Sequence, residues 1–217
     1  MGTEALFWKD PYQKEFEARV ISSNGKEVVL DRTCFFPQGG GQVGDTGFLN
    51  DARVVDTRKD ENYNITHFLE KESVFKEGEV VRGRIDWDRR YKIMRLHSAA
   101  HVVYCLMIDV FGEGCRLASS GIVNERKDIT DYLTTSFDRE RLVVVEKRAN
   151  ELIGKGGEIR TWCDESKPNY RLWEIDGFPR MPCGGTHPKR LEEIGGVIVA
   201  RGKKPGAGKE RIDILLR

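Results

Sequence analysis

The chain has 217 residues, of which 39% are hydrophobic, enough for one large or two small domains with buried cores. Its formal net charge of +1 excludes a global polycation that would hold nucleic acid by charge alone. No apolar run approaches about 18 residues, so we expect no membrane-spanning segment. Five cysteines without a CxxC pair, and no N-terminal signal segment, predict a reducing, cytoplasmic location.

Residues 1–87 are predicted to form a β domain. Phe16, Ala18 and Val20 alternate with polar residues, and the turn sequence at 23–26 predicts a hairpin that returns over 27–31. Short strands with polar turns between them are then expected at 47–50, 52–57, 65–69 and 80–86. Six short strands at this spacing are typical of a small barrel.

A glycine-rich segment, TCFFPQGGGQVGDTG, follows the hairpin at residues 33–47. Three consecutive glycines often serve turn chemistry alone, and the absent GxxxxGK[ST] pattern excludes a phosphate loop. Here Thr33 and Gln42 bracket the glycines, so an exposed loop could present their polar side chains to a ligand, while glycine lets that ligand approach the main chain. We therefore take Gly39, Gly40 and Gly41 as a substrate loop and Thr33 and Gln42 as candidate catalytic residues.

A long helix is predicted over 88–111, which contains no Gly or Pro and has apolar residues at helical spacing, with Asp88 as its N-cap. His97 and His101 lie four residues apart within HSAAH. On a helix such residues share one face, with Cβ atoms roughly 5–6 Å apart, so two imidazoles can bind one ion. An isolated H-x-x-x-H motif, however, more often consists of surface or buried core histidines than of metal ligands.

Residues 88–217 are predicted to mix strands and helices. Strands are expected at 116–124, 128–137, 158–164, 170–175, 196–201 and 211–215. A helix should start at its N-cap Asp138, run through Leu152 and end at Gly154. Because strands and helices do not alternate regularly, the sequence predicts an α+β fold rather than a doubly wound one.

The second histidine motif is Cys183-Gly184-Gly185-Thr186-His187, whose glycines and flanking prolines disfavour a helix. It is predicted to fold back as a loop with Cys183 and His187 pointing the same way. The chain has only four histidines, and three fall in these two motifs. Together with His97 and His101, this borderline-soft N/S set suits one Zn²⁺ per chain.

Cys105 continues the helical stripe of His97 and His101 but is excluded as a ligand. At 1.5 Å rise per residue, His97 and Cys105 are about 12 Å apart along the axis, too far for one ion with bonds of about 2.0–2.3 Å. Cys105 is therefore predicted to be a buried, small apolar residue. The other three cysteines, Cys34, Cys115 and Cys163, have no partner pattern and are taken as structural.

Two basic runs could contact RNA phosphates, although a solvated surface is the commoner explanation for such runs. They consist of Arg84, Arg89, Arg90, Lys92 and Arg95, and of Arg201, Lys203, Lys204, Lys209 and Arg211.

The glycine-rich block, DWDRRYKIMRLHSAAH, and PCGGTH followed by EIGGVIV, in this order and spacing, resemble the editing domain of alanyl-tRNA synthetases. With no synthetase portion attached, the chain is similar to the free-standing AlaX proteins of the medium-length type, from about residue 10 onward. The histidine pair alone also occurs in the editing domain of threonyl-tRNA synthetases. Cys34 is a departure, because a small or apolar residue is expected there. The resemblance implies a small β-barrel (1–87) followed by an α/β two-layer zinc-binding editing domain (88–217).

The resemblance further implies trans-editing, the hydrolysis of the ester that links a wrong amino acid, chiefly serine with glycine as a second candidate, to alanine tRNA. A pocket built for alanine cannot strongly reject an analogue that only adds a hydroxyl, so a second sieve is needed. A threonine at the position of Thr33 is expected beside the substrate's amino acid. Its hydroxyl can donate to and accept from a serine hydroxyl.

The nucleophile is predicted to be water, because no Ser or Cys lies in a recognisable nucleophile motif and only His67 remains as a base. Zinc could lower the pKa of water or orient the substrate, but four protein ligands are also the pattern of a structural site. Two alternatives therefore stay open: a non-catalytic tRNA-binding module with structural zinc, and a zinc hydrolase for small esters or amides. The second lacks HExxH or an equivalent general base. The oligomeric state is not predicted.

Overall fold

The computed structural model describes residues 2–134, 137–167 and 170–217. The described chain divides into two compact units. The first comprises residues up to Gly39 and Val43–Arg90, and the second comprises Gly40–Gln42 and Tyr91–Arg217. Three residues of the glycine-rich segment, 40–42, therefore belong to the second unit.

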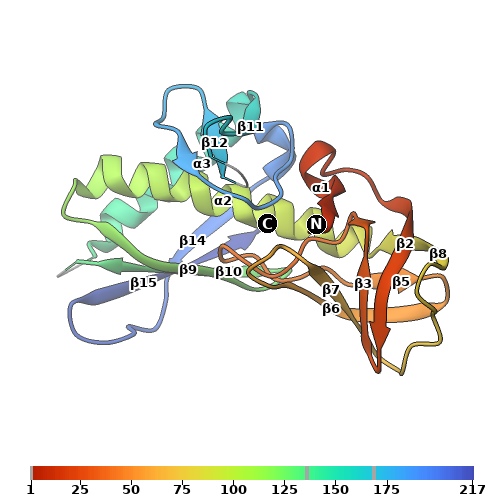
Figure 1. The fold of residues 1–217 in the computed structure, drawn as a ribbon. Coiled ribbons are helices and arrows are strands. Elements are labelled where there is room, and N and C mark those ends of the chain that lie inside the picture. The colour runs from red at the N-terminus through yellow and green to blue at the C-terminus, as the bar shows by residue number, and fades with distance from the viewer. Residues whose placement is uncertain (1, 135–136, 168–169) are drawn as a thin grey trace. The chain divides into compact units, whose positions relative to one another are not determined.

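The first unit contains a closed antiparallel barrel, as the sequence predicted, with strands in the order β2-β3-β7-β6-β5-β8 (Figure 1). The strand bounds are β2 Glu15–Asn24, β3 Glu27–Leu30, β5 Gly47–Leu49, β6 Ala52–Lys59, β7 Ile65–Leu69 and β8 Val80–Ile85. Along the first half of β2, Phe16, Ala18 and Val20 are buried while their neighbours are exposed. This period of two places one apolar face inside the barrel, and Gly25 with φ 57° turns the chain between β2 and β3.

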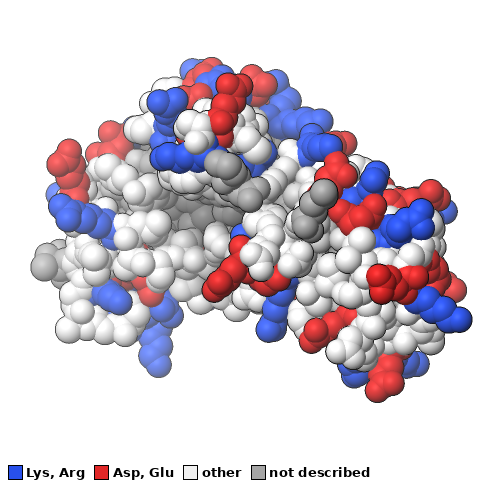
Figure 2. All heavy atoms as spheres, in the orientation of Figure 1, with Lys and Arg blue, Asp and Glu red and all other residues white. Residues whose placement is uncertain are grey.

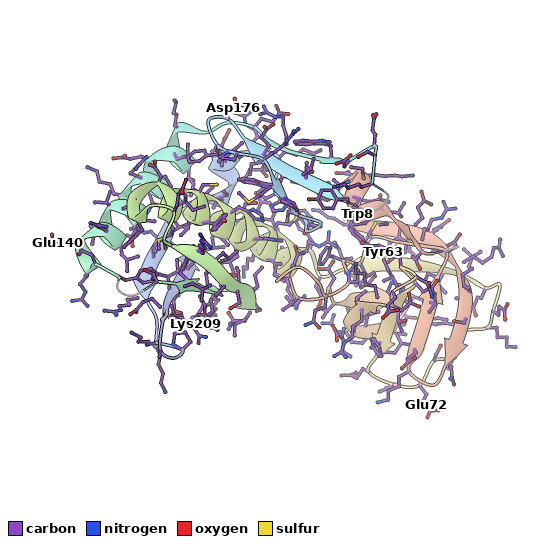
Figure 3. The ribbon with its side chains drawn as sticks, turned by 60° about the vertical axis from the view of Figure 1, so that its left-hand side comes forward. Trp8, Tyr63, Glu72, Glu140, Asp176 and Lys209 are labelled. Carbon is purple, nitrogen blue, oxygen red and sulfur yellow. The ribbon has the colours of Figure 1, made fainter. Side chains whose placement is uncertain are left out.

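Three short elements in the first unit were not predicted. Strand β1 (Glu4–Ala5) runs parallel to β4 (Arg32–Thr33), and helix α1 (Leu6–Lys9) joins a small aromatic cluster. In that cluster Trp8 and Tyr63, both labelled in Figure 3, have ring centroids 5.1 Å apart. Elements of two to four residues are too short to show a periodic pattern in sequence.

Arg90, predicted to belong to a basic run that could contact RNA, is instead buried in the first unit. Its guanidinium pairs with the carboxylate of Asp45 and donates to the carbonyl oxygen of Cys34 at 2.6 Å. The side chains of Arg90 and Asp45 are 0% and 1% exposed. Arg90 therefore has a structural role. Removing one partner of such a buried ion pair typically costs about 3–5 kcal/mol of stability.

The second unit is built on a four-stranded antiparallel sheet, β14-β15-β10-β9, with helices over one face (Figure 1). The bounds are α2 Trp87–Phe111, β9 Arg116–Asn124, β10 Lys127–Leu133, α3 Arg139–Lys155, β14 Val197–Arg201 and β15 Lys209–Leu216. A smaller sheet follows the order β11-β12-β13, with bounds β11 Ile159–Cys163, β12 Arg171–Ile175 and β13 Met181–Pro182. A 3-10 turn, η1, spans Leu191–Ile194. The fold class is α+β, as predicted.

The predicted element ends hold in part. Asp138 caps α3 as expected, since its side chain accepts from the Glu140 N–H. The helix continues past Gly154 to Lys155 and ends at Gly156, whose φ of 75° is a backbone angle that favours glycine. Helix α2 starts at Trp87, so Asp88 lies in its first turn and is not its N-cap. Strand β10 ends at Leu133, and residues 135–136 of the predicted strand lie outside the described residues.

Helix α2 is long and apolar enough to cross a membrane by length and composition alone. However, 67% of its most apolar window is buried inside the protein, as is typical of a core helix.

Candidate metal centre

Helix α2 places His97 and His101 one turn apart, with ring centroids 5.0 Å from each other. Apolar residues recur along it at helical spacing, and of these Ile93, Leu96, Val103 and Leu106 are buried while Val110 is partly buried. The helix packs in the core of the second unit, which leaves His97 buried and His101 half-buried. His97 is only 7% exposed.

The loop after β13 turns back on itself, as predicted, and brings Cys183 and His187 together. The Cys183 N–H donates to the carbonyl oxygen of Arg171 on β12, which fixes the start of the loop at 2.9 Å. The Cys183 Sγ then lies 3.2 Å from His187 Nε2. The loop needs a glycine at 185, because a Cβ there would lie 2.1 Å from His97 Cε1.

His97, His101, Cys183 and His187 form one cluster, whose four ligand atoms all lie within 4.8 Å of one another. The Cys183 Sγ is 3.5 Å from His97 Nε2 and 3.2 Å from His187 Nε2. Bonds of about 2.3 Å to sulfur and 2.0–2.1 Å to nitrogen at a tetrahedral angle require an S–N separation of about 3.6 Å. These two sulfur–nitrogen separations therefore fit a single metal ion held by the four side chains.

Each imidazole is oriented by a partner at its other ring nitrogen, Nδ1. Gln42 Oε1 lies 2.8 Å from His97 Nδ1, and Ser98 Oγ lies 2.8 Å from His187 Nδ1. His101 Nδ1 faces the thioether of Met181 at 2.7 Å, and the His101 ring stacks on Trp173. Such partners fix the ring and leave Nε2 for an ion.

Gln42, a predicted site residue, therefore contacts the cluster directly. Its Oε1 also accepts from the Thr186 N–H at 3.0 Å, and its Nε2 donates to Thr186 Oγ1 at 2.9 Å. One buried amide thus ties His97 to the loop of Cys183 and His187. Sequence reasoning missed Ser98, Met181 and Trp173 in this role, although Ser98 lies within the HSAAH motif itself.

Burial keeps the cluster's imidazoles neutral. It lowers the pKa of His97 to about 4, and the pKa values of His101 and His187 fall well below the usual range for the same reason. Burial also raises the pKa of the Cys183 thiol to about 11. Neutral imidazole and thiolate are the forms that bind metal ions. A cation at the centre would offset the cost of forming the buried Cys183 thiolate.

Cys105 is not a member of the cluster, in agreement with the axial-distance argument. It is 7% exposed, packs in the core of the second unit, and has its pKa raised to about 11 by burial. Cys34 and Cys115 are likewise buried, whereas Cys163 is exposed.

A cavity of about 470 Å³ opens beside the cluster. Its walls include His97, His101 and Cys183, together with Gly40 of the glycine-rich loop. A space of this size and mixed apolar and polar lining is typical of a small-molecule site. Among the described residues, the cavity and the four-residue cluster form one continuous candidate site.

The three loop glycines lie in different surroundings. Gly41, with φ 80°, lies against β9, where a Cβ would come within 2.8 Å of the Ser120 carbonyl oxygen, and its own carbonyl accepts from the Ile122 N–H. Gly40 lines the cavity, whereas Gly39 belongs to the first unit. Glycine is therefore required at 41 by both space and backbone angle.

Thr33 lies in the first unit, fully buried at the end of β4. Its Oγ1 lies 2.8 Å from His67 Nε2 and accepts from the Phe35 N–H at 3.0 Å. His67 Nδ1 lies 3.0 Å from the Val28 carbonyl oxygen, so Nδ1 carries the proton and the Thr33 hydroxyl donates to Nε2. The hydroxyl thus has a structural role, whatever else it contacts.

This network makes stability depend on pH. Burial lowers the pKa of His67 to about 4 from an ordinary 6.5. Because the folded-state pKa is the lower one, its contribution is complete above pH 6.5 and is lost as the pH falls toward 4. For the metal-free protein, we expect the free energy of unfolding measured with urea to fall by up to roughly 3 kcal/mol between pH 6.5 and pH 4 because of His67. The His67→Gln variant should have a shallower slope, and equal slopes would contradict the assignment.

The remaining basic residues of the two runs are largely engaged within the protein. Arg201 and Lys204 pair with Glu210, and Arg211 pairs with Asp131. On the face drawn in Figure 2, acidic and basic side chains are interspersed. Lys92 and Lys203 are exposed and remain candidates for contact with phosphates.

Residues 3–89 match the family described as tRNA synthetases class II (A). Over nearly its whole length the chain is similar to the alanyl-tRNA editing protein AlaX-M of Pyrococcus horikoshii, with 36% identity over 99% of this chain and 98% of the relative. The AlaX-M protein of Saccharolobus solfataricus is 33% identical, with 97% of both chains covered. An alanine–tRNA ligase of Methanococcus maripaludis is 36% identical over 97% of this chain, which spans only 26% of that enzyme.

The site is thus a His/Cys cluster that could hold a metal ion, in a chain whose residues 3–89 match the class II (A) synthetase family. The chain belongs to the AlaX-M family of alanyl-tRNA editing proteins.

Proposed function

We propose that this chain is a trans-editing hydrolase, which deacylates alanine tRNA that carries serine or glycine, in the cytoplasm. Membership of the AlaX-M family supports editing of alanyl-tRNA. The observation that carries the proposal is the four-residue cluster that opens onto a cavity of about 470 Å³. The reaction consumes one water for each ester bond and needs no ATP.

Zinc is the ion we assign to the cluster, because three imidazoles and one thiolate match its preferences in ligand and geometry. Bound there, zinc would supply Lewis-acid polarisation or water activation. His97, His101, Cys183 and His187 would hold it.

The protein's other residues orient this centre. The Gln42 amide holds His97 and the Thr186 backbone in place, so we assign it a positioning role. Gly40 leaves the cavity wall open at main-chain level, where the substrate can approach.

The experiment that tests the function compares seryl-, glycyl- and alanyl-tRNA of the alanine type. Each is incubated with metal-loaded protein and the loss of the ester is followed. We expect rapid loss of the seryl ester and slow loss of the alanyl ester. Alanine has no hydroxyl, so it leaves unpaired the polar group of the site that hydrogen-bonds the serine hydroxyl. A protein that binds these tRNAs but releases no amino acid would contradict the proposal.

That contrary result would favour a tRNA-binding module with a structural zinc. Four closely placed protein ligands are the pattern of structural sites, and this observation keeps the alternative in view. A hydrolase for small esters is disfavoured, because the chain belongs to the AlaX-M family of alanyl-tRNA editing proteins.

Thr33 is proposed as the residue that distinguishes serine from alanine. Thr33→Val keeps the shape and removes the hydroxyl, so one lost hydrogen bond of about 1–2 kcal/mol should lower the seryl-to-alanyl rate ratio roughly five- to thirtyfold. It should also destabilise the fold by about 1–3 kcal/mol, because His67 Nε2 and the Phe35 N–H lose their partner. An unchanged rate ratio in a folded, metal-loaded variant would leave Thr33 with its structural role only.

A further inference from the structure

A carboxyl group lies on the face of the large sheet that should be apolar. Asp128 and Thr130 on β10 are each 2% exposed, and the register pairs them with Ile214 and Ile212 of β15, which are both fully buried. Burial raises the pKa of Asp128, which reflects the cost of placing a charge there. Packing gives no reason for a carboxyl at this position, where an apolar residue would be more stable.

The partners of Asp128 are two hydroxyl groups. Thr130 Oγ1 donates to Asp128 Oδ1 at 2.6 Å, and Ser120 Oγ on β9 lies 3.3 Å from Oδ2. The register places Ser120 directly opposite Thr130. The two hydroxyl oxygens lie 3.2 Å apart, and a hydroxyl has two lone pairs, so each oxygen can still accept from a further donor when its proton is donated to the carboxylate.

These hydroxyls face the candidate site. Ser120 and Thr130 line the same cavity as His97, His101 and Cys183. Arg171, on β12, also lines the cavity and acts electrostatically on Cys183. One wall of the cavity is therefore backed by a carboxylate and carries hydrogen-bond acceptors, and another carries a guanidinium beside the metal cluster.

We propose that Ser120, Thr130 and Asp128 form a subsite for the α-ammonium group of the amino acid in the ester. An ammonium group has three donors, so it can bind both hydroxyl oxygens while its charge offsets that of Asp128. The ester carbonyl carbon is bonded to the carbon that bears the ammonium group, so the carbonyl is then directed toward the cluster and Arg171. This inference rests on the proposed function and deepens it: the substrate must carry a free α-amino group.

The test compares seryl-tRNA(Ala) with the same tRNA carrying an ester in which a hydroxyl replaces the α-ammonium group. For the wild type we expect kcat/KM to favour the ammonium ester by on the order of tenfold to a hundredfold, the range of a hydrogen bond to a charged group. Asp128→Asn keeps the shape without the charge, and should reduce this preference to within a few fold with normal metal content. Thr130→Val is measured in parallel and should also reduce the preference. It provides the test if Asp128→Asn does not fold.

Asp131→Asn is the matched control, because Asp131 lies on the same strand but pairs with Arg211 and does not line the cavity. It should keep the wild-type preference. A wild type that cleaves both esters equally, or Asp128 and Thr130 variants that change only the seryl-to-alanyl ratio, would overturn the inference while editing stands.

If the wild type cleaves neither ester, the proposed function fails, and binding decides the subsite separately. Calorimetry with L-serinamide and its α-hydroxy analogue should then show that the wild type prefers the ammonium compound and that Asp128→Asn does not. Equal binding of the two compounds by the wild type would overturn the subsite.

Discussion

Cys183→Ala is expected to lose the metal and to lower deacylation by roughly a hundredfold or more. The variant removes the only thiolate of the four-residue cluster, leaving three imidazoles with no negative charge to offset that of a divalent ion. It also lacks the sulfur that lies 3.2 Å from His187 Nε2. Metal content per chain, measured after dialysis against a weak chelator, and the rate of seryl ester loss are the two readouts.

Cys105→Ala provides the contrast, because Cys105 is buried on the same helix as two of the ligands but lies outside the cluster. Its loss should leave metal content unchanged and cost about 1 kcal/mol of stability for the lost packing. Equal loss of metal in both variants would show that the helical geometry was wrongly applied to Cys105.

Gly185→Ala is expected to be nearly as damaging, although the substitution adds one methyl group. A Cβ at 185 would lie 2.1 Å from His97 Cε1, 2.4 Å from His97 Nδ1 and 2.8 Å from Gln42 Oε1. Both neighbours are buried and hold each other, so neither can move without breaking their hydrogen bond. We expect a ten- to hundredfold loss of metal affinity and a destabilisation of about 1–3 kcal/mol.

Gly154→Ala is the control for this change, since a Cβ at 154 meets nothing within 4 Å. It lies inside α3, where Ala is favoured over Gly by up to about 1 kcal/mol, so this variant should be as stable as the wild type or more stable. Metal binding should be unaffected. A Gly185→Ala protein with normal metal affinity would show that the loop and His97 relax more easily than their burial suggests.

The four-residue cluster could be predicted from sequence because its geometry is local in each half. An i, i+4 pair on a helix and a Cys-Gly-Gly-Thr-His loop each specify the direction of their side chains. The barrel was predictable for a similar reason, since alternation in β2 and a glycine turn define a hairpin. Both inferences depend on short-range rules that hold before any tertiary contact forms.

The features that escaped prediction depend on long-range contacts. Met181 and Trp173 reach the His101 ring from strands far along the chain, and no spacing rule connects them to it. Arg90 looked like one of several surface cations because a run of basic residues carries no information on which one meets Asp45. Polar residues on the buried face of β10 were likewise hidden within an ordinary strand pattern.

The assignment of residues 40–42 to the second unit limits how this protein can be dissected. A fragment that began at residue 91 would contain all four cluster residues, yet it would lack the Gln42 amide that holds His97 and the Thr186 backbone. It would also lack the Gly41 carbonyl that accepts from Ile122 on β9. Residues 91–217 are therefore not a complete unit by themselves, because the earlier part of the chain supplies residues 40–42.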